Sequence, residues 1–265
     1  MEKKRLCIFV SFFLILATCL NGCDSKKHSD PLIAGVRDDI MNFGYLNTNT
    51  GKYYGLEIDL AYALAEELGY DDVEFVSVTP DNRKDILLNG EVDCLIATYS
   101  IVESRQENFD FSAPYYTDYS EIMVEKSTLF YDINDLKGKT IGVLSGTNTG
   151  PELAAKLKEL GLISGEVISN SDTGTEYDGI YIRKLNQYRD LSEALEVGTV
   201  DAVCMDGCIA RTYMTDSRII LEDTVSEQHY GVATQKGSTL SKPVAQAIEK
   251  MLDDGTIDRL VEKWN

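Results

Sequence analysis

The sequence has 265 residues, of which 43% are hydrophobic and 26% are charged. These fractions are typical of a globular protein and argue against a disordered or fibrous chain. Its 44 acidic and 25 basic residues give a net charge of −19, which repels phosphate backbones, so we expect no nucleic-acid partner. The two histidines, His28 and His229, are too few for a histidine-rich metal site. We therefore expect neither a metal nor another cofactor.

The N-terminal segment has the pattern of an export signal. Basic residues at 3–5 precede an apolar run at 6–20, which is too short for an ordinary membrane span and suits a secretory signal. The following Leu-Asn-Gly-Cys at 20–23 resembles the bacterial lipoprotein box. That resemblance implies a signal peptide at 1–22, a lipid on Cys23 and a short lipidated tether at 23–30. A plain signal peptide or a core helix is the alternative. We expect an extracytoplasmic protein anchored to the cell membrane by its N-terminal lipid.

The remaining cysteines predict no disulfide framework. Cys94, Cys204 and Cys208 are an odd number once the signal is removed and Cys23 is lipidated. Cys204 and Cys208 are four residues apart but lack a second pair of metal ligands. We therefore interpret all three as small apolar side chains.

From residue 32 onward, predicted strands alternate with predicted helices, which implies parallel α/β layering. Residues 164–180 are rich in Ser, Gly, Asp and Thr, and we predict a long surface loop there. The predicted strands are 32–37, 73–78, 92–98, 140–144, 200–205 and 230–235, and the predicted helices are 56–68, 83–89, 151–160, 190–197, 241–253 and 256–264.

Residues 85–98 and 193–206 share one pattern: a short helix, Gly, any residue, Val, Asp, an apolar strand and a polar residue. This internal echo predicts two α/β lobes built alike, although two common helix–strand units could also match by coincidence. Thr98 and Asp206 occupy matching places at the carboxyl ends of their strands. Ligands of open α/β sheets bind beyond those ends, so we expect a cleft with Thr98 on one wall and Asp206 on the other.

The residues after the first of these strands suit a carboxylate. Ser100 and Arg105 follow Thr98, and a guanidinium offers a planar fork of donors that matches two oxygens. A surface salt bridge from Arg105 to Glu103 or Glu107 is the alternative.

The second wall offers complementary groups. Residues 145–150 read Ser-Gly-Thr-Asn-Thr-Gly before a predicted helix, whose start would expose backbone N–H groups. An ordinary N-cap turn is the alternative. A buried Asp206 needs a cationic partner, and a ligand ammonium would provide it. Carboxylate on one side and ammonium on the other describe an α-amino acid.

Six stretches, in order along the chain, resemble the type II solute-binding proteins of polar amino-acid ABC transporters, also called family 3. The resemblance implies a periplasmic-binding-protein type II fold, in which two α/β lobes are joined by a two-strand hinge around a ligand cleft. We expect lobe 1 at 31–117 plus 228–265 and lobe 2 at 118–227, with the chain crossing near 116–120 and 225–229. The stretches are GKYYGLEIDLA at 51–61, NGEVD at 89–93, SIVESR at 100–105, FDFSAPYY at 109–116, DLKGKTIGV at 135–143 and VDAVCMD at 200–206.

The resemblance also implies roles for single residues. Arg105 would clamp the α-carboxylate of the ligand, and Asp206 would take the α-amino group. Tyr188 matches a position that can touch the ligand. The remaining expected contacts come from Thr98, Ser100, Thr147, Asn148 and Thr149.

Two further arginines bear on the ligand side chain. Arg37 ends the first strand and Arg83 opens a helix. Family members with basic residues at both places tend to bind glutamate or aspartate, and two guanidinium groups suit a second ligand carboxylate. Ion pairs with Asp38, Asp39 or Asp81 are the alternative use of these arginines, and glutamine or another polar amino acid is the alternative ligand.

We therefore expect a monomeric, non-enzymatic component of an amino-acid importer. It would capture an amino acid by hinge closure and deliver it to a membrane-embedded ABC permease with its cytoplasmic ATPase. A dehydratase-like enzyme on the same fold is the alternative, because fold does not fix function. A ligand-sensing receptor would need a further membrane helix or signalling domain.

Overall fold

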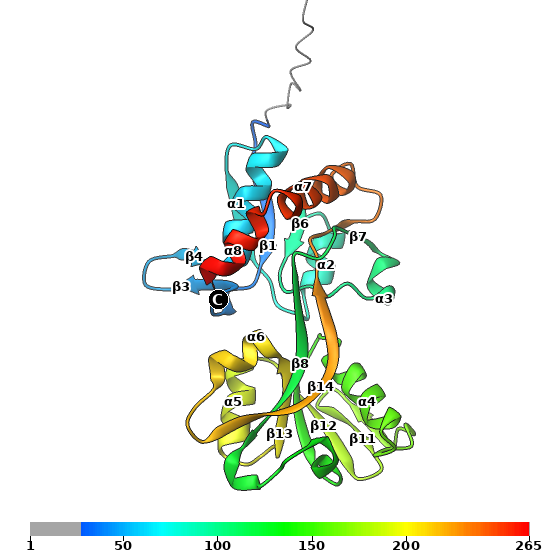
Figure 1. Cartoon of the computed structure of the whole chain (residues 1–265). Coiled ribbons are helices and arrows are strands. Elements are labelled where there is room, and N and C mark those ends of the chain that lie inside the picture. Colours follow the sequence, from blue (N-terminus) through cyan, green and yellow to red (C-terminus); the bar gives the residue numbers. More distant parts are fainter. Residues whose placement is uncertain (1–27, 265) are drawn as a thin grey trace, which may run out of the picture.

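The computed structural model describes residues 28–264, which form two α/β lobes connected by a pair of long strands (Figure 1). The expected fold class, two lobes of the type II periplasmic-binding-protein architecture, is confirmed. The exact lobe boundaries, 117/118 and 227/228, remain a proposal.

The upper lobe in Figure 1 is built on a five-stranded sheet. Strand β1 lies between parallel neighbours β5 and β6, while β15 pairs antiparallel with β6 and β7. A small antiparallel sheet extends from its side. The strands of the main sheet are β5 (Val73–Ser77), β1 (Leu32–Val36), β6 (Cys94–Ile96), β15 (Ala233–Gln235) and β7 (Phe109–Phe111), and those of the small sheet are β2 (Asp39–Ile40), β3 (Gly44–Asn47) and β4 (Lys52–Tyr54).

Five helices cover this sheet. Helix α1 ends at Gly69, whose φ of 81° is the left-handed conformation that glycine tolerates without steric cost. It packs against α7 and α8, the last two helices of the described chain. The helices are α1 (Leu56–Leu68), α2 (Arg83–Leu88), α3 (Glu103–Gln106), α7 (Ser241–Asp253) and α8 (Thr256–Trp264).

The lower lobe holds a seven-stranded sheet in the order β10-β11-β12-β9-β13-β8-β14. Its helices are α4 (Thr149–Glu159), α5 (Tyr188–Glu196) and α6 (Gly207–Ala210), with 3₁₀ turns η1 (Lys126–Thr128), η2 (Ile133–Leu136) and η3 (Arg211–Tyr213). Its strands are β8 (Tyr116–Glu125), β9 (Thr140–Leu144), β10 (Ser169–Ser171), β11 (Gly174–Tyr177), β12 (Ile180–Leu185), β13 (Ala202–Asp206) and β14 (Arg218–Tyr230).

The surface loop predicted for residues 164–180 is wrong over most of its length. Strands β10 and β11 form an antiparallel hairpin that continues into β12 at the sheet edge. The edge is largely exposed, so its side chains pair with one another by hydrogen bonds, as Ser169 does with Glu176 and Thr175 with Asn170. The prediction failed because strands at such an edge do not need alternating apolar and polar residues, which is the pattern used to predict a strand.

The strand predicted at 230–235 is divided into two parts. Strand β14 ends at Tyr230 and β15 begins at Ala233, because the chain there leaves the long hinge strand and enters the sheet of the upper lobe. Gly231 lies at the bend, where a side chain would collide with Ile101.

The internal echo has a structural counterpart. The Asp93 carboxylate accepts a hydrogen bond from the Ile33 N–H at the start of β1, at 2.8 Å. The Asp201 carboxylate accepts one from the Thr140 N–H at the start of β9, also at 2.8 Å. In each lobe this aspartate accepts from a backbone N–H within the first two residues of the neighbouring parallel strand, so the repeated Val-Asp pattern fixes the same strand pairing twice.

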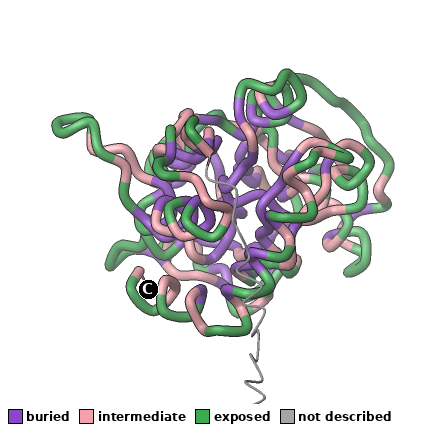
Figure 2. Tube along the Cα trace, turned by 90° about the horizontal axis from the view of Figure 1, so that it is seen from above, coloured by how far each residue is buried: buried purple, intermediate pink, exposed green. Residues whose placement is uncertain are grey.

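Strands β8 and β14 connect the lobes. They pair antiparallel from Tyr116 opposite Tyr230 to Glu125 opposite Arg218, with two register shifts between Ile220 and Ser226. Buried residues are concentrated along the middle of the molecule in the view from above (Figure 2). The two hinge strands therefore lie beside the region where the lobes meet.

Candidate ligand-binding site

The two residues expected on opposite walls are both buried between the lobes. Thr98 follows β6 of the upper lobe, and Asp206 ends β13 of the lower lobe with 8% of its surface exposed. Burial lowers the pKa of Arg105, and the negative charges of Glu152 and Asp206 act in the opposite direction. The structure therefore brings the predicted Arg105 and Asp206 into one electrostatic environment.

The Asp206 carboxylate is held by hydroxyl groups. One oxygen accepts a hydrogen bond from Ser120 at 2.8 Å and the other accepts one from the Tyr230 hydroxyl at 2.5 Å. Burial raises the pKa of Asp206 to about 6, and the charges of Asp118 and Glu152 act in the same direction. A cation at this carboxylate would favour its ionised form.

Thr98 has a backbone φ of 44°, which is rare for a residue other than glycine. Its N–H donates to Oε1 of Glu57 at 2.5 Å. Arg83 donates to the carbonyl oxygen of Ala97 at 2.7 Å and, more weakly, to that of Thr98. Two buried side chains, Glu57 and Arg83, thus bind the N–H and the carbonyl of the peptide bond between Ala97 and Thr98.

Arg105 lies near Asp206 without a salt bridge of its own. It donates to the carbonyl oxygen of Ser100 at 2.7 Å, and its guanidinium carbon is 4.2 Å from the centre of the Tyr99 ring. Within residues 28–264 no carboxylate lies in ion-pair range of Arg105, so the surface pair with Glu103 or Glu107 is not formed. The fork retains donors for a ligand carboxylate.

The other two arginines differ in their partners. Arg37 forms an ion pair with Asp39 at 2.7 Å and lies over the ring of Tyr188, so one of the alternatives for Arg37 is realised. Arg83 lies 4.4 Å from the Tyr99 ring centre and has no carboxylate in ion-pair range among the described residues. Burial lowers the pKa of Arg83 to about 9, and the positive charges of Arg105 and Arg37 add to that effect.

The turn before α4 leads to the first backbone N–H groups of that helix. The Thr147 hydroxyl donates to the Leu144 carbonyl, and the Asn148 amide donates to Glu152 and Gln228. Asn148 precedes the helix but makes no side-chain cap hydrogen bond, and Thr149 is buried. The first N–H groups of a helix lack intrahelical acceptors and carry its positive dipole end, which suits an anionic ligand group.

Glu57 and Gln228 belong to the same region, and sequence reasoning assigned neither. Gln228 of β14 is buried, and its amide oxygen accepts from Ser100 of the upper lobe and from Asn148 of the lower lobe. Glu57 is fully buried at the start of α1. One signal was visible for Glu57: a charged residue stands between Leu56 and Ile58, on the apolar run of a helix.

The lobes also touch at the edge of the cleft. The Ser145 hydroxyl donates to the Asp81 carboxylate at 3.2 Å. A side chain on Gly146 would place its Cβ 2.4 Å from that carboxylate and 2.7 Å from the Pro80 carbonyl carbon. The alternative in which Asp81 forms an ion pair with an arginine is not realised, and Asp81 contacts the opposite lobe instead.

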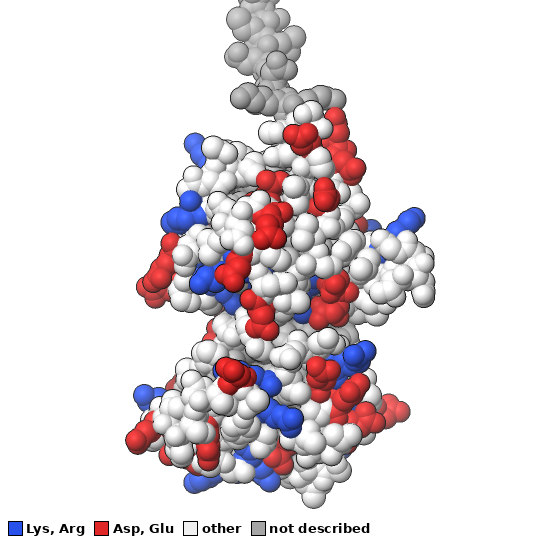
Figure 3. Space-filling view, turned by 180° about the vertical axis from the view of Figure 1, so that it is seen from behind, with Lys and Arg blue, Asp and Glu red and all other residues white. Residues whose placement is uncertain are grey.

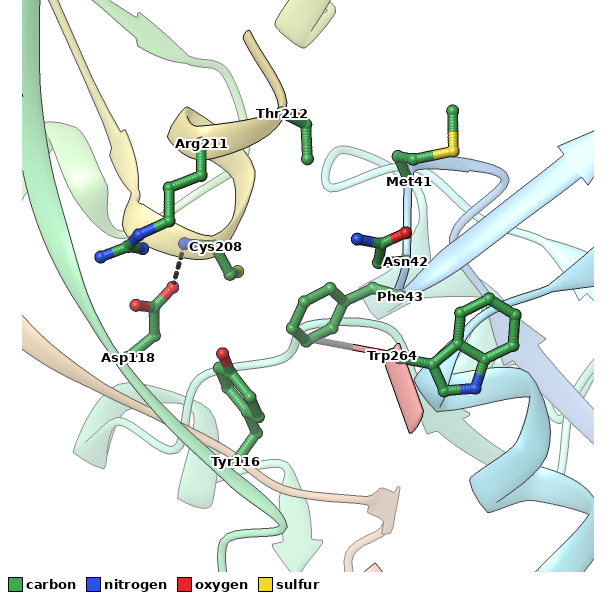
Figure 4. A pocket seen from close by; sticks show the side chains of 9 residues that line it. All are labelled: Met41, Asn42, Phe43, Tyr116, Asp118, Cys208, Arg211, Thr212 and Trp264. Carbon is green, nitrogen blue, oxygen red and sulfur yellow. Dashed lines mark hydrogen bonds between the residues drawn. The ribbon is translucent and has the colours of Figure 1, made fainter. Parts of the chain in front are cut away.

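A cavity of about 640 Å³ lies on one flank of the cleft (Figure 4). Phe43 and Tyr116 line it with ring centres 5.0 Å apart, and Tyr116 stacks on Tyr230. The hydroxyl of Tyr230 binds Asp206, so these rings lie between the cavity and the polar site. The other lining residues are Met41, Asn42, Asp118, Cys208, Arg211, Thr212 and Trp264.

A family model described as bacterial extracellular solute-binding proteins, family 3, matches residues 32–265. The glutamine-binding protein GlnH of Bacillus subtilis is 26% identical and covers 100% of this chain and 97% of its own. The glutamate-binding protein GluB of Corynebacterium efficiens is 25% identical, with 97% and 89% covered. An ancestral arginine-binding protein solved with arginine has a TM-score of 0.74 at 31% identity, covering 88% and 97%.

Two expectations concern the membrane. The signal peptide predicted at 1–22, Cys23 and residues 23–27 of the predicted tether lie outside the described residues, whereas residues 28–30 of the tether are described. Among residues 28–264, no helix combines the length and the apolar character that a membrane crossing requires.

Proposed function

Because the chain belongs to the bacterial extracellular solute-binding proteins of family 3, we propose that it captures an amino acid outside the cytoplasm and delivers it to a membrane-embedded ABC permease with a cytoplasmic ATPase. One observation carries the proposal. Half-buried Arg105 lies near enough to buried Asp206 for their charges to interact, and Arg105 has no carboxylate in ion-pair range among the residues described.

The amino-acid backbone fits these groups by charge. Arg105 binds the α-carboxylate, assisted by Ser100 and by the N–H groups at the start of α4. Asp206 binds the α-ammonium, together with Thr98. Because the two walls belong to different lobes, the ligand favours the closed arrangement only through contacts with both.

The side chain that we propose is acidic, as in glutamate or aspartate. Arg37 and Arg83 are both buried, and the positive charge of Arg37 adds to the lowering of the pKa of Arg83 by burial and by Arg105. A ligand carboxylate would offset this repulsion. The similarity to GluB, a glutamate-binding protein, also supports an acidic ligand. Glutamine is the second candidate, because Arg37 already pairs with Asp39 and GlnH is also similar.

The negative charge of the whole chain does not exclude an anionic ligand. Figure 3 shows acidic and basic side chains interspersed over both lobes on one face. Charges farther than about 8 Å are screened at physiological salt. The nearby guanidinium groups therefore dominate at contact.

We further propose that a lipid on Cys23 holds the protein, as a monomer, at the outer side of the cell membrane. The Leu-Asn-Gly-Cys pattern supports this anchor. An enzymatic role is disfavoured because the matching family consists of solute-binding proteins. Calorimetric titration with an amino acid, followed by analysis of the mixture, separates binding from turnover.

The decisive test starts with a thermal-shift screen against the twenty amino acids, because a ligand bound to the native state raises its melting temperature. The best ligand is then titrated into Arg105→Ala, and we expect binding to be lost, since removing one member of a buried charge pair costs about 3–5 kcal/mol. Arg189→Ala is the control, because Arg189 is exposed and its side chain contacts Glu193 of its own helix and the neighbouring Gln187. Equal affinity of the two variants would contradict the clamp.

A further inference from the structure

Glu57 is the least expected charge in the molecule. Its exposed fraction is 0%, although a buried carboxylate is costly unless it has partners. Oε1 accepts two hydrogen bonds, from the Thr98 N–H and from the Tyr115 hydroxyl at 2.6 Å. Oε2 is buried and has no hydrogen-bond partner among the described residues.

This arrangement favours the ionised form. The Thr98 N–H can only donate, so the oxygen that it contacts must accept, and a proton on Oε2 would have no acceptor within the described chain. Burial raises the pKa of Glu57, whereas its hydrogen bonds and the charges of Arg37 and Arg83 lower it. Its place in the first turn of α1 adds the favourable helix dipole.

The negative charge acts on the two arginines proposed for the ligand side chain. Glu57 and Arg83 hold the same peptide group, because the Thr98 N–H donates to Glu57 and the Ala97 carbonyl accepts from Arg83. The positive charges of Arg37 and Arg83 act against the effect of burial on the pKa of Glu57, so the three charges interact. The Nε atoms of both arginines are buried without a hydrogen-bond partner among the described residues, although Arg37 also pairs with Asp39. Glu57 therefore reduces the positive potential that an incoming ligand side chain meets.

We infer that Glu57 is a specificity-determining residue of the cleft: its buried carboxylate holds the strained Thr98 turn and sets how strongly Arg37 and Arg83 favour an anionic over a neutral ligand side chain. The inference rests on the proposed function. It places selectivity partly on a residue that the ligand does not need to touch. Removing the charge while keeping the shape should shift binding towards glutamate.

The test compares the dissociation constants of glutamate and glutamine in wild type and in Glu57→Gln. The substituted amide oxygen still accepts from Thr98 and Tyr115. We expect the ratio of glutamate affinity to glutamine affinity to rise about tenfold, the effect of one unit charge at roughly 10 Å in an effective dielectric of about 20.

One control separates charge from structure. Glu66→Gln removes an exposed charge from the same helix. It should leave the ratio within about twofold of wild type, because it changes no buried charge. A purely structural Glu57 would weaken both ligands equally in E57Q, and that result overturns the inference.

Failure of the variant to fold does not block the measurement. If E57Q is unfolded without ligand, the concentration of each amino acid needed to refold it reports the same ratio, because ligand stabilises the native state in proportion to its affinity. Failure of wild type to bind any amino acid would instead reject the proposed function itself. An unchanged ratio with intact wild-type binding rejects only the role of Glu57.

Discussion

Replacement of Gly146 by alanine should weaken ligand binding by preventing the lobes from meeting. Gly146 has a φ of 69°, and an added Cβ would lie 2.4 Å from the Asp81 carboxylate, 2.7 Å from the Pro80 carbonyl carbon and 2.8 Å from the Asp81 nitrogen. The carboxylate can rotate away. The two backbone atoms belong to the opposite lobe and can be relieved only if the lobes separate.

The expected loss of affinity follows from separating the cost of backbone strain from the cost of the steric contact. The left-handed backbone costs alanine about 1 kcal/mol, but this strain lies within one lobe and is equal in open and closed protein. The steric contact exists only when the lobes meet, and overpacking of this kind costs about 1–3 kcal/mol. The ligand-bound form alone bears that second cost, so Kd should rise about 5- to 150-fold.

Gly198→Ala is the matched control for calorimetry. Gly198 has a φ of 71° in the same lobe, and nothing lies within 4 Å of its added Cβ. Both variants should lose similar stability without ligand, whereas only Gly146→Ala should lose affinity. Equal Kd values for the two would refute the conclusion that ligand binding requires this contact.

Four further results are expected. Ligand affinity should fall about tenfold for each pH unit below about 6 as Asp206 takes up a proton, and Asp206→Asn should abolish this dependence. In the ligand-free protein the same raised pKa acts on stability in the opposite direction, because the folded protein takes up the proton more readily than the unfolded chain. The contribution of Asp206 to stability in thermal melts should therefore increase as pH falls from about 6 towards 4. Arg37→Ala should weaken glutamate more than glutamine in calorimetry, and equal losses would remove the acidic-ligand proposal. Cys23→Ala should release the protein from the membrane fraction into the medium or periplasm, and continued membrane association would reject the lipid anchor.

The repeated part of the fold could be predicted because its signal is local. The Val-Asp pattern before β6 and β13 is visible within a few residues, and its aspartates bind strand starts in the same way in both lobes. That pattern also placed Thr98 and Asp206 at strand ends. The general rule for ligands of α/β sheets then located the cleft.

The parts that sequence reasoning missed depend on distant partners. Glu57 is 41 residues from Thr98, and Gln228 is 128 residues from Ser100. No local periodicity reports such pairs, because they form only when distant parts of the chain meet in the folded protein, within the upper lobe for Glu57 and at the hinge for Gln228. The hairpin of β10 and β11 was missed for another reason: its exposed strands are stabilised by polar side chains that also suit loops.

The ladder between β8 and β14 restricts which relative movements of the lobes are possible. A slide of one strand along the other by one residue would turn every side chain to the opposite face, carrying Ser120 and Gln228 away from Asp206 and Ser100. Bending of the paired ribbon preserves each partner. The lobes should therefore rotate about this ribbon while its polar side chains keep their positions along the two strands. Each time the cleft closes, the same hydrogen-bond donors and acceptors should then face each other.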